Sequence, residues 1–295
     1  MLWAAMISIS ILTTVYSVCL KSIQRQYIRH RADFFAFSFL MNLCQLIVML
    51  LIPPYGGMVF SPESLLFGVT IGVLILANYI FTVQAFSQGP LALTNSIFGI
   101  NIIIPIIYGL FFWDETLSVL EIAGLVLFMI SMLFVSNATY FEDQAVKKTD
   151  VKWLVSVLLS FACSGSTMVI SKHFARIRPT ETREYLLVYI MTNILLSIAA
   201  YWFLRRKSPA SAGRMIPNRT WLLLSLAAGS TIALANVLFM HAIGQFASVL
   251  FFPVTRGLSI ILMLVVSLFF KERLSRKALV GFTLSTLAII LLSIG

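Results

Sequence analysis

The sequence has few charged residues, and long parts of it have none. Of its 295 residues, 11% are charged and 60% are hydrophobic. No charged residue occurs from Ser64 to Trp113, and only Arg256 interrupts the run from Thr220 to Phe270. A soluble globular protein needs more polar surface than this composition supplies. The chain is therefore predicted to be an integral membrane protein with the lipid bilayer as its main solvent.

Cysteine is scarce, and the signatures of metal sites and catalytic centres are missing. Cys19, Cys44 and Cys163 lie singly in apolar segments, with no C-x-x-C spacing. This pattern predicts neither a disulfide framework nor a metal cluster, and no cofactor is expected. The sequence contains no H-E-x-x-H, no G-x-S-x-G and no acidic cluster at helix ends. A membrane enzyme is therefore disfavoured.

The formal net charge of +10 at pH 7 reflects short basic clusters between apolar segments. Such clusters orient a membrane protein, so no nucleic-acid partner is expected. Lys and Arg concentrate in the loops after the first, fifth, seventh and ninth apolar segments, whereas the opposite side holds Lys172, Arg176, Arg178 and Arg183. The positive-inside rule then places both termini outside the cytoplasm.

Ten apolar segments approach the length of about 20 residues that a membrane-spanning helix needs. The predicted spans are 2–20, 34–52, 62–85, 91–112, 117–138, 151–171, 184–204, 220–242, 247–270 and 275–294. Residues 1–20 have no preceding basic region and no convincing cleavage site, so we expect a retained helix rather than a signal peptide. The predicted fold is all-α and polytopic.

Two parts of the sequence follow the same plan. Residues 97–124 and 255–281 each contain an early glycine, a long apolar run, a double-aromatic end, Glu-x-Leu-Ser and a further glycine. Offsets of 151 to 158 positions align Lys21 with Lys172, Asp33 with Glu184, Asn42 with Asn193, Asn78 with Asn236, Gly99 with Gly257, Glu115 with Glu272, and Gly124 with Gly281. Such consistent offsets indicate an internal duplication.

The duplication predicts two five-helix repeats, residues 1–141 and 151–295, joined by a polar linker at 142–150. Because five is an odd number of spans, the second repeat enters the membrane from the opposite side. Inverted repeats are a recurrent plan of secondary transporters, whose halves exchange conformations to open a cavity first to one side and then to the other.

The repeated motif resembles that of the EamA-like families of the drug/metabolite transporter superfamily. Its best-matching residues are 111–118 (FFWDETLS) and 268–275 (LFFKERLS), together with Pro253, and the resemblance covers essentially the whole chain. It implies a ten-helix carrier of small metabolites, often an exporter, with a cavity lined by helices 1, 3, 4, 6, 8 and 9. Members usually keep both termini in the cytoplasm, against the charge count here.

Arg256 is the most informative candidate site residue, because it lies within the ninth span just after Pro253. A charged side chain at membrane depth needs a cavity or a partner. Its planar guanidinium suits a substrate carboxylate or phosphate. The alternatives are that it reaches the lipid headgroups or bonds the carbonyls freed by Pro253. Its counterpart in the first repeat is Phe98, so the charge belongs to one repeat alone.

Polar residues within the spans form the remaining candidates. An amide within the membrane must find a hydrogen-bond partner, either another helix or a ligand. Those predicted to bind substrate are Asn78, Tyr79, Asn236, Asn95 and Asn101. Thr14 and Thr167 belong to stripes of small hydroxyl residues on the first and sixth spans, for which close helix packing is the default interpretation. Asn42 and Asn193 are predicted to join helices.

Acidic residues are absent from the interior of every predicted span. This argues against a small multidrug cation antiporter, which needs an intramembrane carboxylate. Glu115 and Glu272 are predicted to cap the helices that follow them. Lys21 and Lys172, at the ends of the first and sixth spans, suit the helix dipole and the interface, and substrate contact is the alternative.

The leading hypothesis is a secondary transporter of a small neutral or anionic metabolite, for instance an amino acid, in a bacterial inner membrane. An integral membrane enzyme and a non-transporting scaffold are the alternatives. An enzyme needs a convergent catalytic set, and a scaffold would be expected to carry a soluble domain. The expected partners are therefore a small-molecule substrate and the bilayer, and the sequence gives no signal for an oligomeric state.

Overall fold

A computed structural model describes residues 2–26, 31–53, 57–88, 94, 97–138, 150–207, 219–269 and 276–295. In these ranges every regular element is a helix, and none of them forms a strand. The elements are α1 (Leu2–Gln26), α2 (Arg31–Leu51), α3 (Pro62–Gln88), η1 (Ile100–Ile102), α5 (Ile103–Phe112), α6 (Val119–Ala138), α7 (Val151–Ile177), η2 (Pro179–Glu181), α8 (Thr182–Lys207), α9 (Arg219–Ile243), α10 (Ser248–Phe269) and α11 (Arg276–Ile294).

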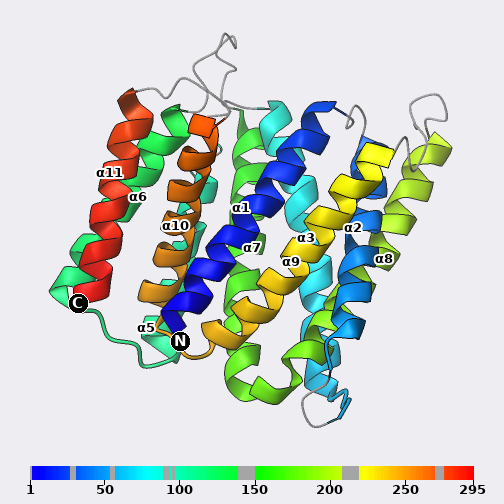
Figure 1. The fold of residues 1–295 in the computed structure, drawn as a ribbon, viewed down its shortest axis with the longest axis horizontal. Coiled ribbons are helices and arrows are strands. Elements are labelled where there is room, and N and C mark those ends of the chain that lie inside the picture. The colour runs from blue at the N-terminus through cyan, green and yellow to red at the C-terminus, as the bar shows by residue number, and fades with distance from the viewer. Residues whose placement is uncertain are drawn as a thin grey trace. The chain divides into compact units, whose positions relative to one another are not determined.

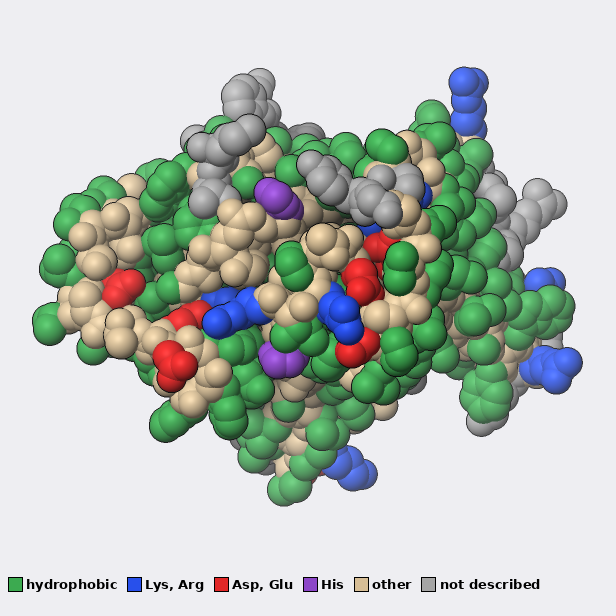
Figure 2. All heavy atoms as spheres, turned by 90° about the horizontal axis from the view of Figure 1, so that it is seen from below, with side chains coloured by type: hydrophobic (Ala, Val, Ile, Leu, Met, Phe, Trp, Pro, Cys, Tyr) green, Lys and Arg blue, Asp and Glu red, His purple; other side chains and the backbone are tan. Residues whose placement is uncertain are grey.

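The helices have the length and surface of membrane spans. Seven of them (α1, α2, α3, α7, α8, α9 and α11) are long and apolar enough to cross a membrane, and three shorter apolar helices occur at Ile97–Phe112, Val119–Val135 and Ser248–Met263. Many large hydrophobic side chains are exposed on the described helices, and hydrophobic side chains are widespread on the face shown in Figure 2. Contiguous exposed apolar surface on this scale requires a nonpolar environment. The prediction of an all-helical integral membrane protein is confirmed at this level.

The helices lie where apolar sequence predicts them, with differences at their ends. Helices α1 and α7 each continue for more than one and a half turns past the predicted span ends at residues 20 and 171. The fourth predicted segment is interrupted by the 3-10 turn η1. Pro105 explains this turn, because it has no N–H to donate to the carbonyl of Asn101 and so breaks the α-helical hydrogen-bond pattern.

The chain forms two compact units, each built from both halves of the sequence. Unit 1 comprises Met1–Leu76 and His173–Gly244, and unit 2 comprises Ala77–Lys172 and Gln245–Gly295. Helices α3 and α7 therefore contribute one part to each unit (Figure 1). The predicted linker, apart from Asp150, lies outside the described residues.

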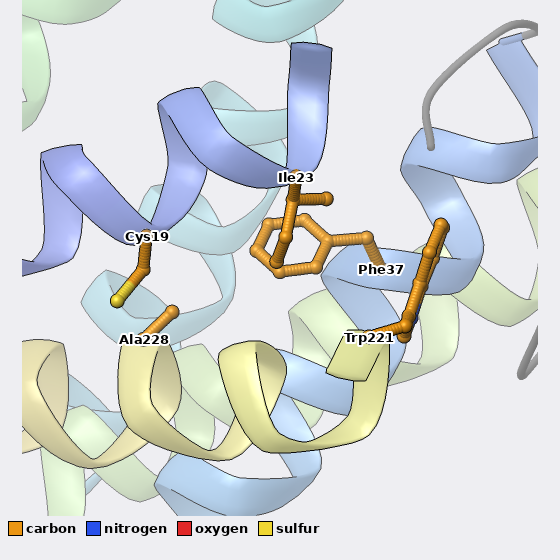
Figure 3. Packing of buried hydrophobic residues seen from close by; sticks show 5 residues of the cluster. All are labelled: Cys19, Ile23, Phe37, Trp221 and Ala228. Atoms are coloured by element: carbon orange, nitrogen blue, oxygen red, sulfur yellow. The ribbon is translucent and has the colours of Figure 1, made fainter. Parts of the chain in front are cut away.

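In unit 1, α1 packs against α9, and α2 packs against both α8 and α9. Figure 3 shows the buried cluster where α1, α2 and α9 meet, formed by Cys19, Ile23, Phe37, Trp221 and Ala228. The rings of Phe37 and Trp221 meet edge to face with centroids 6.4 Å apart, a favoured aromatic geometry. This cluster joins the N-terminal and C-terminal segments of the unit.

In unit 2, α6 and α11 make the most extensive helix pairing. A Cβ atom on Gly124 would lie 3.2 Å from the carbonyl oxygen of Ala288, and one on Gly281 would lie 3.1 Å from that of Ser131. The two glycines thus allow the backbones to approach closely. Since the start of each helix meets the end of the other, α6 and α11 run antiparallel (Figure 1).

Candidate functional site

Two predicted site residues meet one polar face of α7 in unit 2. Ser160 and Ser164 are four residues apart and therefore share a helical face. Ser160 donates a hydrogen bond to Oδ1 of Asn78 at 2.6 Å and shares another with Thr82 at 2.7 Å. The Nδ2 group of Asn101 donates to the hydroxyl of Ser164 at 2.5 Å. Hydroxyls on α7 thus anchor amides from two other segments of the unit.

The amide of Asn101 is buried and incompletely hydrogen-bonded. Its side chain is 4% exposed, and its Oδ1 atom has no hydrogen-bond partner in the described part of the chain. The oxygen and nitrogen of an amide are assigned from their surroundings, so either end could face Ser164. Buried polar atoms are normally satisfied, so this amide can hydrogen-bond a water molecule or a small ligand.

Arg256 lies on α10, three residues after Pro253. Its side chain is exposed. No hydrogen bond or ion pair joins it to another described residue, so its predicted alternative role of bonding the carbonyls freed by Pro253 is not observed there. Among the described residues nothing occupies its donors, and their planar arrangement suits an anion.

Asn236 belongs to a second polar group, in unit 1. Its side chain is partly buried on α9 and lies near Tyr189 on α8. Tyr16 on α1 also lies near Tyr189. The sequence analysis singled out Asn236 but missed both tyrosines, because an aromatic residue in an apolar helix carries no local signal of a polar partner.

The contacts described for the remaining predicted site residues do not indicate substrate binding. Thr14 and Thr167 donate to backbone carbonyls of their own helices, those of Ser10 and Ser164. These bonds agree with the default packing role. Tyr79 is partly buried on α3, and Asn95 lies outside the described residues.

Asn42 and Asn193 show what a structural amide does in this protein. Each is buried and donates to the backbone carbonyl four residues earlier in its own helix, that of Ser38 or Tyr189. A hydrogen bond between α2 and α8 instead joins the hydroxyls of Ser38 and Ser197 at 3.0 Å. These asparagines therefore satisfy themselves locally, rather than bridging helices as predicted.

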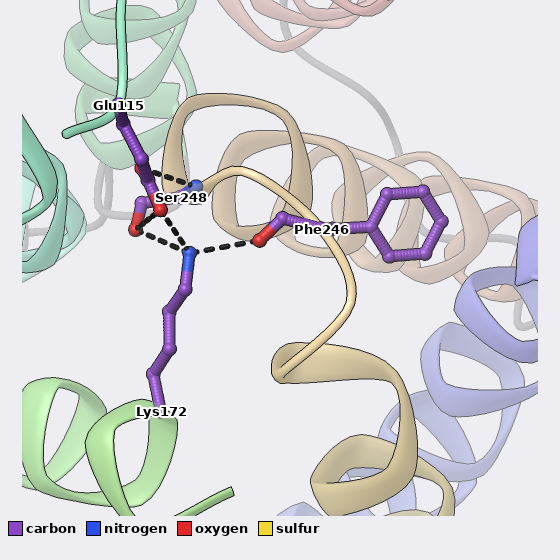
Figure 4. A network of polar contacts seen from close by, with 4 residues as sticks. All are labelled: Glu115, Lys172, Phe246 and Ser248. Carbon is purple, nitrogen blue, oxygen red and sulfur yellow. Dashed lines mark hydrogen bonds and ion pairs between the residues drawn. The ribbon is translucent and has the colours of Figure 1, made fainter. Parts of the chain in front are cut away.

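A charged network that the sequence analysis did not foresee lies at one end of unit 2 (Figure 4). The ammonium of Lys172, 1% exposed, donates to Oε1 of Glu115 at 2.5 Å. It also donates to the Phe246 carbonyl and the Ser248 hydroxyl, both at 2.8 Å, and lies 4.9 Å from the ring centre of Trp113. The backbone N–H of Ser248 donates to Oε2 of Glu115 at 2.8 Å. One ion pair thus joins α7, the turn before α6 and the start of α10.

The network corrects the role predicted for Glu115. The helix that follows it, α6, is capped by a reciprocal pair in which the Ser118 N–H donates to the Glu121 carboxylate and the Glu121 N–H to the Ser118 hydroxyl. Glu115 instead caps α10, whose first residue is Ser248. Gly109 makes room for it, because a Cβ there would lie 2.9 Å from the Glu115 carboxyl carbon.

Comparison with known proteins identifies a fold but no function. No protein-family model matches the chain, and no curated protein matches it. A solved structure named only "Crystal structure of protein" is similar over 98% of both chains, with a TM-score of 0.71 and 15% sequence identity. At that identity the likeness shows a shared fold alone.

Proposed function

We propose that this protein is a secondary transporter that exports a small neutral or anionic metabolite, such as an amino acid, by alternating access. The proposal includes ten membrane spans in two inverted five-helix repeats, relationship to the EamA-like families of the drug/metabolite transporter superfamily, and location in a bacterial inner membrane. Its support comes from paired contacts in the two repeats and from one charged side chain.

Equivalent contacts recur in the two sequence copies. Gly99 faces Met132, whose sulfur would lie 3.1 Å from an added Cβ. Gly257 faces Ile289, whose Cδ1 would lie 2.8 Å from an added Cβ. Offsets of 158 and 157 positions relate the first pair to the second. Two copies that fold alike and enter a membrane from opposite sides are the basis of alternating access in inverted-repeat transporters.

The observation that carries the proposal is Arg256. It is a cation on an apolar helix, its side chain is exposed, and it has no hydrogen-bond or ion-pair partner among the described residues. Intramembrane charges usually face a pathway or a partner. A guanidinium presents a fork of donors that matches a carboxylate. We assign it as the anion clamp, with Asn78 and Asn101 of the same unit as neutral hydrogen-bonding groups for the rest of the substrate.

Two measurements test the proposal. A thermal-shift screen of the purified protein against carboxylate and neutral metabolites is expected to find compounds that raise its apparent stability, because a ligand of the folded state stabilises it. Each such compound is then measured in proteoliposomes for counterflow of its radiolabelled form. Saturable flux supports a transporter, and conversion to a product would indicate an enzyme. Inertness toward the whole panel in both assays would favour a scaffold and overturn the proposal.

A further inference from the structure

The ion pair of Lys172 and Glu115 is buried but joins segments far apart in the sequence. Lys172 is 1% exposed and Glu115 11% exposed. Their partner Ser248 lies 76 and 133 positions away from them, respectively. Each charge is fully used: the ammonium has three oxygen partners, and both carboxylate oxygens accept hydrogen bonds. The network is therefore complete in this conformation.

A buried ion pair has only two favourable arrangements. The charges are either joined and fully hydrogen-bonded, or apart and both hydrated, because a single charge left in an apolar environment is strongly unfavourable. An apolar contact of similar volume would hold three segments together as well or better. What the ion pair adds is a contact that can separate completely once water enters. Such a contact suits segments that are joined in one conformation of the protein and separated in another.

We infer that Lys172, Glu115 and Ser248 form a conformational latch that keeps this end of unit 2 closed. Breaking it frees the start of α10 from α7 and from the turn before α6, and lets water reach the buried residues behind Ser248. The role of the latch in a transport cycle rests on the transporter proposed above. In that cycle the latch holds one of the two access states. Its existence is a property of the fold that can be measured without substrate.

A buried reporter tests the latch directly. Val249 follows Ser248 on α10 and is 1% exposed. In a background with Cys19, Cys44 and Cys163 replaced by alanine, Val249→Cys supplies a single thiol. Its rate of modification by a water-soluble maleimide is measured in detergent. Lys172→Met and Glu115→Gln are each expected to raise this rate at least tenfold, because each leaves one buried charge without its counter-ion.

The double variant Lys172→Met/Glu115→Gln separates a latch from general damage. It leaves no buried charge, so its thiol is expected to react more slowly than in either single variant. The control is Glu63→Gln, which removes the exposed ion pair with Arg178 at 3.2 Å and is expected to change the rate by less than twofold. Glu115→Asp, which keeps the charge but shortens its reach, replaces any single variant that fails to fold and is expected to accelerate labelling severalfold.

The latch is overturned if the single variants, or Glu115→Asp in their place, react no faster than the parent. It is also overturned if the double variant reacts faster than both single variants. Flux in proteoliposomes is scored separately. If labelling is accelerated but the protein transports nothing, the latch is supported and the proposed transport function is wrong. Unchanged labelling in a protein with substrate flux would remove the latch and leave the transporter.

Discussion

Gly124 on α6 and Gly281 on α11 face equivalent parts of each other's helices. Gly124 lies against the carbonyl of Ala288, seven positions after Gly281, and Gly281 lies against the carbonyl of Ser131, seven positions after Gly124. Reciprocal contacts of this kind are the mark of a two-fold axis between like elements. They support two copies of one sequence plan that meet in opposite directions within unit 2.

Adding a methyl group at these glycines is expected to destabilise the protein. Overpacking a close helix contact raises the free energy of the folded state by about 1–3 kcal/mol. Gly281→Ala is expected to lower the thermal unfolding midpoint more than Gly124→Ala. Its Cβ would lie 2.6 Å from Cγ2 of Val135 and 3.0 Å and 3.1 Å from two backbone atoms, those of Val135 and Ser131. A Cβ on Gly124 would lie 2.8 Å from Cγ of Leu292 and 3.2 Å from one backbone atom, the oxygen of Ala288. The control is Ala123→Val on the exposed face of α6. Equal midpoints for both glycine variants and the parent would contradict the close contact.

The asparagines are expected to divide into two functional classes. Asn78→Ala and Asn101→Ala are predicted to raise the substrate concentration for half-maximal counterflow about twofold to tenfold, as expected for one lost hydrogen bond of about 0.5–1.5 kcal/mol. Asn42→Ala and Asn193→Ala are matched controls, because both are buried amides that bond their own helices. They are predicted to lower thermal stability without changing that concentration. A similar rise in all four variants would remove the first pair from the binding site.

Glu115 and Ser118 belong to the same motif, but substituting them is expected to lower the free energy of unfolding by different amounts. Glu115→Gln leaves Lys172 as an uncompensated buried charge, which destabilises a folded protein by about 3–5 kcal/mol. Ser118→Ala removes an N-cap hydroxyl, a loss of about 0.5–2 kcal/mol. Chemical denaturation in detergent should rank the two variants in that order. The reverse order would mean that the motif acts mainly as the cap of α6.

The helices were predictable because hydrophobicity is a local signal, readable in any window of about 20 residues. The turn at η1 was not predicted, although Pro105 explains it. Local reasoning assigned Glu115 to the helix beside it, whereas its partners Lys172 and Ser248 lie 57 and 133 positions away. Hydrogen-bond partners at such separations depend on how the helices pack, which no local pattern in the sequence encodes.

The same reason explains how the candidate site compares with its prediction. Polar residue types within apolar segments identified Asn78, Asn101 and Arg256, since such residues are unfavourable in lipid without a partner. Their environments could not be read from the sequence. The hydroxyl stripe on the sixth span was assigned to packing, yet two of its members, Ser160 and Ser164, hydrogen-bond the two amides. Likewise, the sequence divides into two consecutive halves, whereas each compact unit draws on both.

Counterflow in proteoliposomes with Arg256 variants tests the central claim most directly. For a carboxylate found in the thermal-shift screen, Arg256→Ala is predicted to reduce counterflow at least tenfold. Arg256→Lys is predicted to retain part of it, because an ammonium keeps the charge but not the two-pronged donor geometry. Thermal midpoints confirm that both variants are folded. Counterflow of every carboxylate substrate at the parental rate in Arg256→Ala would contradict the anion clamp.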